Sequence, residues 1–151
     1  MNLLVANDDG IDDKGIWMLA EQLAAVGNVS LYAPARNYSG AGMSIRLRQT
    51  FDLDSCPAPD GFSLNIPAFS VDAPPATVAA IGTAHAFEGN THAVISGINA
   101  GWNPGAEAYK VSGTVGAAKV AVERGLLGIA VSAAGDGRSA YPAIARAAKR
   151  M

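Results

Sequence analysis

Two adjacent carboxylates, Asp8 and Asp9, follow a short apolar run near the start of the chain. Placing two carboxylates together at the end of a buried strand costs free energy unless a cation neutralises them. Gly10 lets the chain turn sharply, so both side chains can face one point. In the alternative interpretation, one aspartate only caps the following turn or helix. The two residues alone leave both interpretations open.

Two other loops add neutral oxygen donors, the hydroxyl of Ser39 and the side-chain amide of Asn99. Carboxylate, hydroxyl and amide oxygens suit a hard divalent ion such as Mg²⁺ or Mn²⁺ better than zinc or copper. The chain has two histidines and one cysteine, too few for a usual zinc site. Each donor alone is more often a loop-stabilising residue, so the metal hypothesis depends on their convergence.

The segment Ser112-Gly113-Thr114-Val115-Gly116 opens an apolar, alanine-rich stretch that predicts a helix. Backbone N–H groups at a helix start attract anions, and Gly113 lets a phosphate approach closely. An ordinary serine N-cap, with glycines that allow close helix packing, explains the same residues. The segment lacks the Gly-Lys-Ser/Thr ending of a P-loop, and the first strand lacks a dinucleotide-binding Gly-x-Gly-x-x-Gly.

Alternating strands and helices must position these residues. Buried parallel strands are expected at 3–6, 29–33, 92–98 and 127–132, and helices at 16–26, 75–87, 113–124 and 141–150. Alternation at 45–53 predicts a half-exposed strand that forms an antiparallel hairpin with 62–66. The whole is an α/β domain with a mostly parallel sheet, in which ligands bind beyond the carboxyl ends of the strands. The loops with Asp8, Ser39 and Asn99 are expected at that edge.

The composition fits one domain over residues 1–151, with half of the residues apolar. A formal net charge of −2 gives no sign of binding to polymeric nucleic acid. The N-terminus has no basic segment before its apolar run and no cleavage site, and no apolar stretch reaches transmembrane length. We therefore expect a cytoplasmic protein that does not associate with membranes.

Four blocks in order along the chain resemble the signature blocks of the SurE family. They are Asn7-Asp8-Asp9-Gly10, Pro34-Ala35-Arg36-Asn37-Tyr38-Ser39-Gly40, Ser96-Gly97-Ile98-Asn99-Ala100-Gly101 and Ser112-Gly113-Thr114-Val115. Any one block is weak, but the set is specific and extends over the whole chain.

The resemblance implies a Rossmann-like three-layer α/β/α fold. It also implies a metal-dependent nucleotidase, or acid phosphatase, that hydrolyses nucleoside monophosphates with Mg²⁺ or Mn²⁺ through a metal-activated water. The metal ligands implied by resemblance are Asp8, Asp9, Ser39 and Asn99, and the two aspartates are also the implied catalytic residues. The implied phosphate- or substrate-binding residues are Asn37, Asn103, Ser112, Gly113 and Thr114.

The chain departs from the family pattern where Pro74-Pro75-Ala76-Thr77 replaces Pro-Thr-Asp-Cys and where Val111 precedes Ser112. It is also expected to lack the usual C-terminal region, and the apolar surface left there predicts a homo-oligomer. Two alternatives follow, a module that binds metal or nucleotide without turnover and a hydrolase of other esters. An aspartyl-nucleophile phosphatase is disfavoured because Gly10 stands where an Asp-x-Asp motif needs its second aspartate.

Overall fold

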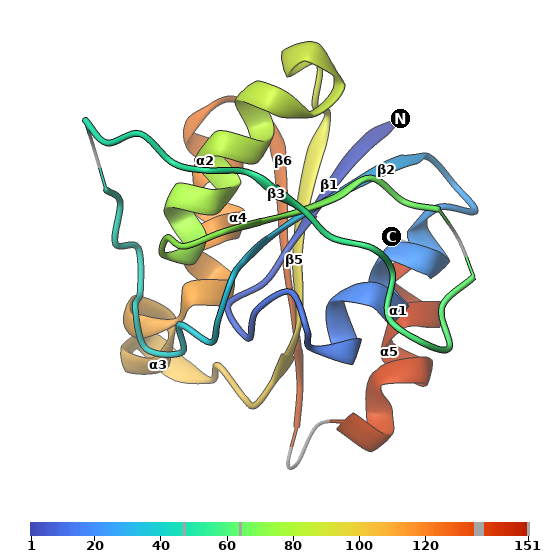
Figure 1. Cartoon of the computed structure of the whole chain (residues 1–151). Helices are drawn as coiled ribbons and strands as arrows, with labels where there is room; N and C mark the ends of the chain where they lie inside the picture. Colours follow the sequence, from blue (N-terminus) through green and yellow to red (C-terminus); the bar gives the residue numbers. More distant parts are fainter. Residues whose placement is uncertain (47, 64, 135–137, 151) are drawn as a thin grey trace.

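The computed structural model describes residues 1–46, 48–63, 65–134 and 138–150. In this part of the chain one sheet has the strand order β3-β4-β2-β1-β5-β6 (Figure 1). Its strands are β1 (Asn2–Ala6), β2 (Asn28–Pro34), β3 (Asp54–Ser55), β4 (Ala68–Val71), β5 (Ala93–Ala100) and β6 (Leu127–Ala133). Neighbouring strands are parallel except for β3 and β4, which are antiparallel.

Helices cover both faces of the sheet, which makes the three-layer α/β/α fold of Rossmann type that was predicted (Figure 1). The helices are α1 (Lys14–Leu23), α2 (Pro75–His85), α3 (Gly105–Val111), α4 (Gly113–Glu123) and α5 (Tyr141–Ala148), with 3₁₀ turns η1 (Ala86–Gly89) and η2 (Arg138–Ala140). Helices α1 and α5 pack together on one face, and α2 and α4 on the other. Within the described residues, no helix has the length and apolar character needed to span a bilayer.

The central strand β1 is buried on both faces, which explains its continuous apolar sequence. Leu3 and Val5 belong to the hydrophobic cluster under α1 and α5, whereas Leu4 and Ala6 belong to the cluster under α2 and α4. Full burial of each leucine or valine stabilises the fold by about 1.5–3 kcal/mol. This packing fixes β1, and therefore the position at which Asp8 and Asp9 leave the sheet.

The predicted hairpin of 45–53 with 62–66 was wrong in position, and residues 47 and 64 lie outside the described residues. The antiparallel pair joins Asp54 to Ser70 and Ser55 to Phe69. The alternation in 45–53 has another cause, because Phe51 and Leu53 pack against the α2–α4 side of the core. The segment therefore crosses a helical layer before its chain reaches the sheet edge.

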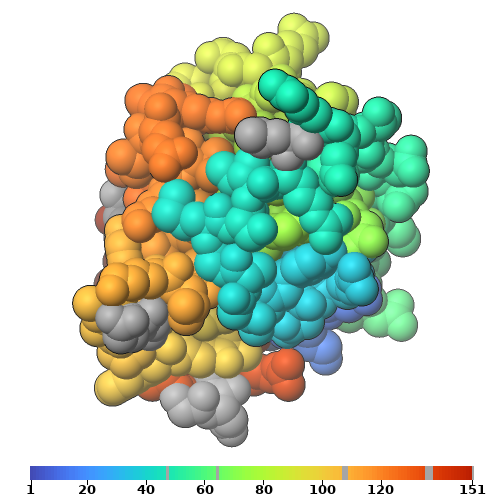
Figure 2. Space-filling model, turned by 90° about the vertical axis from the view of Figure 1, so that its left-hand side faces the viewer, coloured from blue at the N-terminus to red at the C-terminus, as the bar shows by residue number. Residues whose placement is uncertain are grey.

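The strand β4 was not predicted, because no element was assigned to the residues between the expected hairpin and the helix at 75–87. It pairs in parallel with β2, with Leu31 opposite Ala68 and Pro34 opposite Val71. The short helix α3 was also missed, in the segment between the expected strand at 92–98 and the expected helix at 113–124. Figure 2 shows the segment 36–46, in cyan and teal, beside this golden helix, and the Gly42 N–H donates to the Val111 carbonyl at 2.9 Å.

Candidate metal and phosphate site

The carboxyl ends of β1, β2 and β5 lie side by side and carry three of the predicted site loops. β1 pairs with β2 on one side and with β5 on the other, with Ala6 opposite Ser96. The loop that follows Ala6 is closed by Asn7, a buried residue whose side chain donates to the Gly10 carbonyl and accepts from the Gly10 N–H. Gly10 has φ +102°, a conformation that favours glycine. The sharp turn predicted after the aspartate pair is therefore present.

Asp8 is buried, with 3% exposure, and faces the start of α4. The Thr114 hydroxyl donates to Asp8 Oδ1 at 2.7 Å. Burial raises the pKa of Asp8, although the Thr114 hydroxyl and the backbone N–H groups of Thr114 and Gly113 act in the opposite direction. The helix start that was predicted to attract an anion thus already faces one carboxylate.

Asp9 is partly buried and joins the loops that follow β2 and β5. Its Oδ2 accepts from the Ala100 N–H at 3.1 Å, and its Oδ1 accepts from Asn37 Nδ2 at 3.3 Å. Burial is the main cause that raises the pKa of Asp9, and the negative charges of Asp8 and Asp13 raise it further. Both members of the pair are therefore destabilised in their charged forms.

The loop after β2 brings Asn37 and Ser39 to the same rim. Asn37 Oδ1 accepts from the Ser39 N–H at 2.8 Å, and the Tyr38 N–H donates to the Asp8 carbonyl at 2.8 Å. Ser39 is exposed at the edge of this loop. The structure therefore connects Asn37 directly to Asp9 and places Ser39 next to Asn37.

A cluster of three residues that the sequence analysis missed holds this loop in place. The Tyr38 hydroxyl donates to Asp72 Oδ1 at 2.7 Å, and Arg36 Nε donates to the same oxygen at 3.1 Å. The Tyr38 hydrogen bond and the Arg36 charge lower the pKa of Asp72. Asp72 directly follows β4, so recognising this strand would have placed it at the carboxyl edge beside Arg36 and Tyr38.

The two asparagines near the end of β5 make local hydrogen bonds. Asn99 Nδ2 donates to the Gly101 carbonyl at 2.9 Å, and Asn103 Nδ2 donates to Ser132 Oγ at 2.8 Å. Asn99 immediately precedes Ala100, whose N–H binds Asp9, so it lies at the same rim. Asn103 is held against β6, and neither asparagine is hydrogen-bonded to Asp8 or Asp9 in the described part of the chain.

The start of α4 supports the capping interpretation of Ser112 and a special role for Gly113. Ser112 Oγ accepts from the Val115 N–H at 3.2 Å, so this hydroxyl caps the helix as an ordinary N-cap. A Cβ at Gly113 would lie 2.7 Å from the Asp8 Cβ and 2.9 Å from Asp8 Oδ2. Glycine is therefore required for the close approach of this helix to the aspartate.

The donor set fits a hard divalent cation. Two carboxylates are buried together and disfavoured in their charged forms, a cost that a cation offsets. No group of three or more His, Cys, Asp or Glu side chains is placed to hold a metal within the residues described. An ion at Asp8 and Asp9 would therefore complete its coordination with neutral oxygens or water, as Mg²⁺ commonly does.

Comparison with known proteins supports these motifs. Residues 3–151 match the model of a protein family described as survival protein SurE. A 5′-nucleotidase SurE from Dehalococcoides mccartyi (strain CBDB1) is 38% identical over 133 residues, which is 87% of this chain and 48% of that protein. A 5′-nucleotidase SurE from Legionella pneumophila (strain Philadelphia 1) is 37% identical over 151 residues, 100% of this chain and 56% of that protein.

A solved structure gives the same result for the fold. The crystal structure of the SurE protein from Aquifex aeolicus superposes with a TM-score of 0.84 and 32% sequence identity. The match covers 99% of this chain and 58% of that chain. The chain therefore spans about half the length of the curated relatives it matches.

Proposed function

The chain belongs to the SurE family, and we propose that it is a metal-dependent phosphohydrolase that acts on phosphate monoesters, with nucleoside monophosphates as its substrates. The observation that carries the proposal is the burial of Asp8 against the start of α4, which brings the proposed metal ligand to the proposed phosphate-binding helix end. The relatives named 5′-nucleotidase SurE support the substrate class.

The proposed ligands of Mg²⁺ or Mn²⁺ are Asp8, Asp9, Ser39 and Asn99. When bound, such an ion polarises a phosphoryl oxygen and lowers the pKa of water. The Ala100 N–H and Asn37 orient Asp9, while Thr114 orients Asp8. These contacts leave each carboxylate with further lone pairs for an ion, because an ionised carboxylate accepts about four hydrogen bonds.

Ser112, Gly113 and Thr114 at the start of α4 are the proposed binding residues for the phosphoryl oxygens, which would share the N–H groups of Gly113 and Thr114 with Asp8. The partial positive charge of these N–H groups is fixed by the fold, so it can stabilise negative charge that develops as the ester bond breaks. Gly113 lets this helix end lie against Asp8 without a steric clash. Asn37 adds a neutral amide donor from the facing loop, and Asn103 is proposed to contact the substrate from the loop that follows β5.

Asp8 is the proposed acceptor of the proton from the attacking water. Burial raises its pKa, which makes it a stronger base than an exposed aspartate. The neighbouring Asp9 has a raised pKa for the same main reason. Removal of either charge is expected to reduce turnover and metal binding together.

The test is phosphate release from a panel of nucleoside monophosphates, with Mg²⁺, with Mn²⁺ and with a chelator. We expect release that needs the metal and that is lost in Asp8→Asn, with carboxylate esters left intact. Nucleotide or metal binding without phosphate release would instead support a binding module, and turnover of carboxylate esters would support a retuned esterase. A homo-oligomer remains a prediction, to be checked by light scattering.

A further inference from the structure

A cavity of about 420 Å³ lies where the segment 45–51 passes along α2 and α4. Figure 1 shows this segment, in teal, beside the two helices. Its volume is within the range of small-molecule sites. Among the described residues that line it, none belongs to the proposed metal or phosphate site. Arg124, one of the lining residues, follows the end of α4, about 16 Å along the helix axis from Gly113. The cavity is therefore separate from the proposed phosphohydrolase site.

Arg124 brings a guanidinium to this cavity and is held by neutral oxygens. Its Nη1 donates to the Ala80 carbonyl at 2.7 Å and to the Thr83 hydroxyl, both on α2. A guanidinium has five N–H donors, so the three on Nε and Nη2 remain for another acceptor. Arg124 forms no ion pair with a carboxylate in the described part of the chain. Its position is therefore fixed while its charge is not neutralised by direct contact.

Arg46 brings a second guanidinium from the segment that passes along the helices. Its backbone N–H donates to the Thr77 hydroxyl at 2.9 Å, and its Nη1 donates to the Asp72 carbonyl at 3.3 Å. The Arg46 charge helps to lower the pKa of Asp72, but that carboxylate is hydrogen-bonded to Arg36 and Tyr38. Within the described ranges, Arg46 too has no carboxylate in an ion pair with it.

The rest of the lining is largely apolar. Phe51 and Ile81 are partly buried and pack against the core under α2 and α4, and Val120 is 2% exposed. Glu123 also lines the cavity, so its one negative charge stands against the two positive charges of Arg46 and Arg124. An apolar wall excludes water and strengthens the attraction between a guanidinium and an anion. The lining thus combines an apolar surface with one net positive charge.

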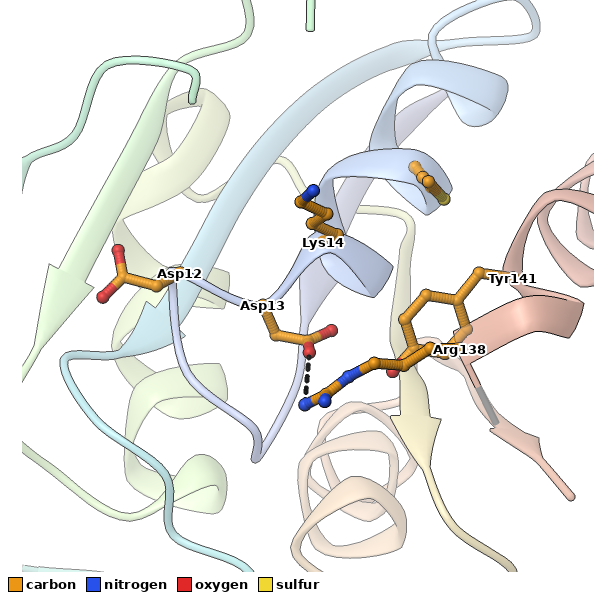
Figure 3. Close-up of a pocket in the computed structure, with 6 residues that line it drawn as sticks. Asp12, Asp13, Lys14, Arg138 and Tyr141 are labelled. Carbon is orange, nitrogen blue, oxygen red and sulfur yellow. Dashed lines mark ion pairs between the residues drawn. The ribbon is translucent and has the colours of Figure 1, made fainter. Parts of the chain in front are cut away.

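The cavity between α1 and α5 has a different character (Figure 3). Its volume is similar, about 350 Å³, but Asp12 and Asp13 balance the charges of Lys14 and Arg138. Figure 3 shows the ion pair between Arg138 and Asp13, in which Arg138 Nη2 lies 3.6 Å from Asp13 Oδ2. This guanidinium already has a carboxylate partner, so the second cavity does not call for an anion in the same way.

We infer that the cavity at α2 and α4 binds a small organic anion that carries one negative charge on an apolar body. The anionic group binds to the free N–H donors of Arg46 and Arg124, and the apolar body packs on Phe51 and the two helices. A guanidinium hydrogen-bonds strongly to sulfonate, carboxylate or phosphate oxygens because both partners are charged. The inference does not depend on the proposed function, because the two sites share no residue.

The test is a calorimetric titration with sodium naphthalene-1-sulfonate, a singly charged aromatic anion that is not a phosphate ester. A chelator is present, so that no anion binds through a metal ion at the aspartate pair. The neutral naphthalene-1-sulfonamide has the same ring system and no charge. We expect the parent to bind the sulfonate at least about tenfold more tightly than the sulfonamide. Arg46→Gln and Arg124→Gln should each weaken sulfonate binding by about tenfold and leave sulfonamide binding nearly unchanged.

Arg138→Gln is the matched control, because it removes a guanidinium from the other cavity. It should bind the sulfonate as the parent does, and melting temperatures verify that each variant is folded. Arg124 also connects α4 to α2, so Arg46→Gln decides the test if Arg124→Gln does not fold. The inference is overturned if the parent binds no sulfonate or binds both compounds equally. It is also overturned if the folded variants at Arg46 and Arg124 keep the parent's affinity, or if only Arg138→Gln weakens binding.

Discussion

The hydroxyl of Thr114 donates a hydrogen bond of 2.7 Å to Oδ1 of Asp8, across a separation of 106 residues in the sequence. Both residues are buried, with exposures of 0% and 3%. The contact joins the loop after the central strand to the first turn of α4. It therefore ties the proposed metal ligand to the proposed phosphate-binding helix end, and the predictions below begin from it.

Thr114→Val keeps the shape of the side chain but removes the donor to Asp8. We expect a loss of about 1–3 kcal/mol in the free energy of unfolding, because a buried acceptor loses its partner. Metal-dependent phosphate release should fall at least about tenfold, since 1.4 kcal/mol corresponds to that factor. Thr114→Ser retains a hydroxyl, so it should keep most of the parent's free energy of unfolding and most of its phosphate release. Equal activity of the valine and serine variants would contradict the positioning role.

Asp9→Asn tests the charge of the aspartate pair. The pKa of Asp9 is raised in the fold, so its contribution to stability decreases as pH rises from the ordinary aspartate value through the folded-state value. At neutral pH and without metal, Asp9→Asn should therefore melt higher than the parent, by about 2–4 °C. The difference should vanish at pH values below the ordinary pKa.

The same variant should lose the response to metal. Added Mg²⁺ or Mn²⁺ is expected to raise the melting temperature of the parent with increasing concentration, because the ion binds the folded state. Asp9→Asn should respond much less. A parent that shows no metal-dependent shift at any pH would count against a metal site at this pair.

Asp72→Asn tests the cluster that holds the loop with Asn37 and Ser39. Its hydrogen bond from Tyr38 is the main cause that lowers the pKa of Asp72 below 3.8. The resulting stabilisation is present above the ordinary pKa and is lost as pH falls through the lower folded-state value. Urea midpoints should thus favour the parent over Asp72→Asn at neutral pH, and the gap should close in acid. A gap of constant size down to strongly acidic pH would argue against this ionisation.

Gly113→Ala tests the close approach of α4 to Asp8. The added methyl would lie 2.7 Å from the Asp8 Cβ and 2.9 Å from the Pro75 Cγ, so the helix end or the aspartate must shift. We expect at least about a hundredfold loss of phosphate release, because small displacements of catalytic groups have effects of that size.

The control for this variant is Gly82→Ala, because the residues around Gly82 do not include Asp8 or Asp9. Its methyl would lie 2.9 Å from a Leu4 methyl and 3.0 Å from the Tyr32 ring. It should lower stability while leaving phosphate release by the folded protein unchanged. If both variants reduce phosphate release equally, the effect of Gly113→Ala is one of general stability.

Much of the fold could be predicted because its signals are local. Continuous apolar runs marked the parallel strands, and Ser112 with the apolar stretch after it marked the start of α4, where the structure has a serine cap. The hairpin was misplaced because alternating apolar residues also arise where an extended segment packs on helices, as Phe51 and Leu53 do. An alternating pattern indicates which side chains are buried, but it does not indicate whether a sheet or a helix buries them.

The sequence by itself determined the parallel α/β architecture and the residues that gather at one edge of the sheet. Parallel strands bring the loops at their carboxyl ends to one edge of the sheet. The succession of strands along the chain was therefore enough to predict that the loops with Asp8, Ser39 and Asn99 lie at the same edge. Only the tertiary structure decided which atoms face each other there. It joined Asp8 to Thr114, turned Asn103 toward Ser132, and supported the β2 loop with Asp72. These contacts join residues distant in sequence, and such contacts depend on packing that no local pattern encodes.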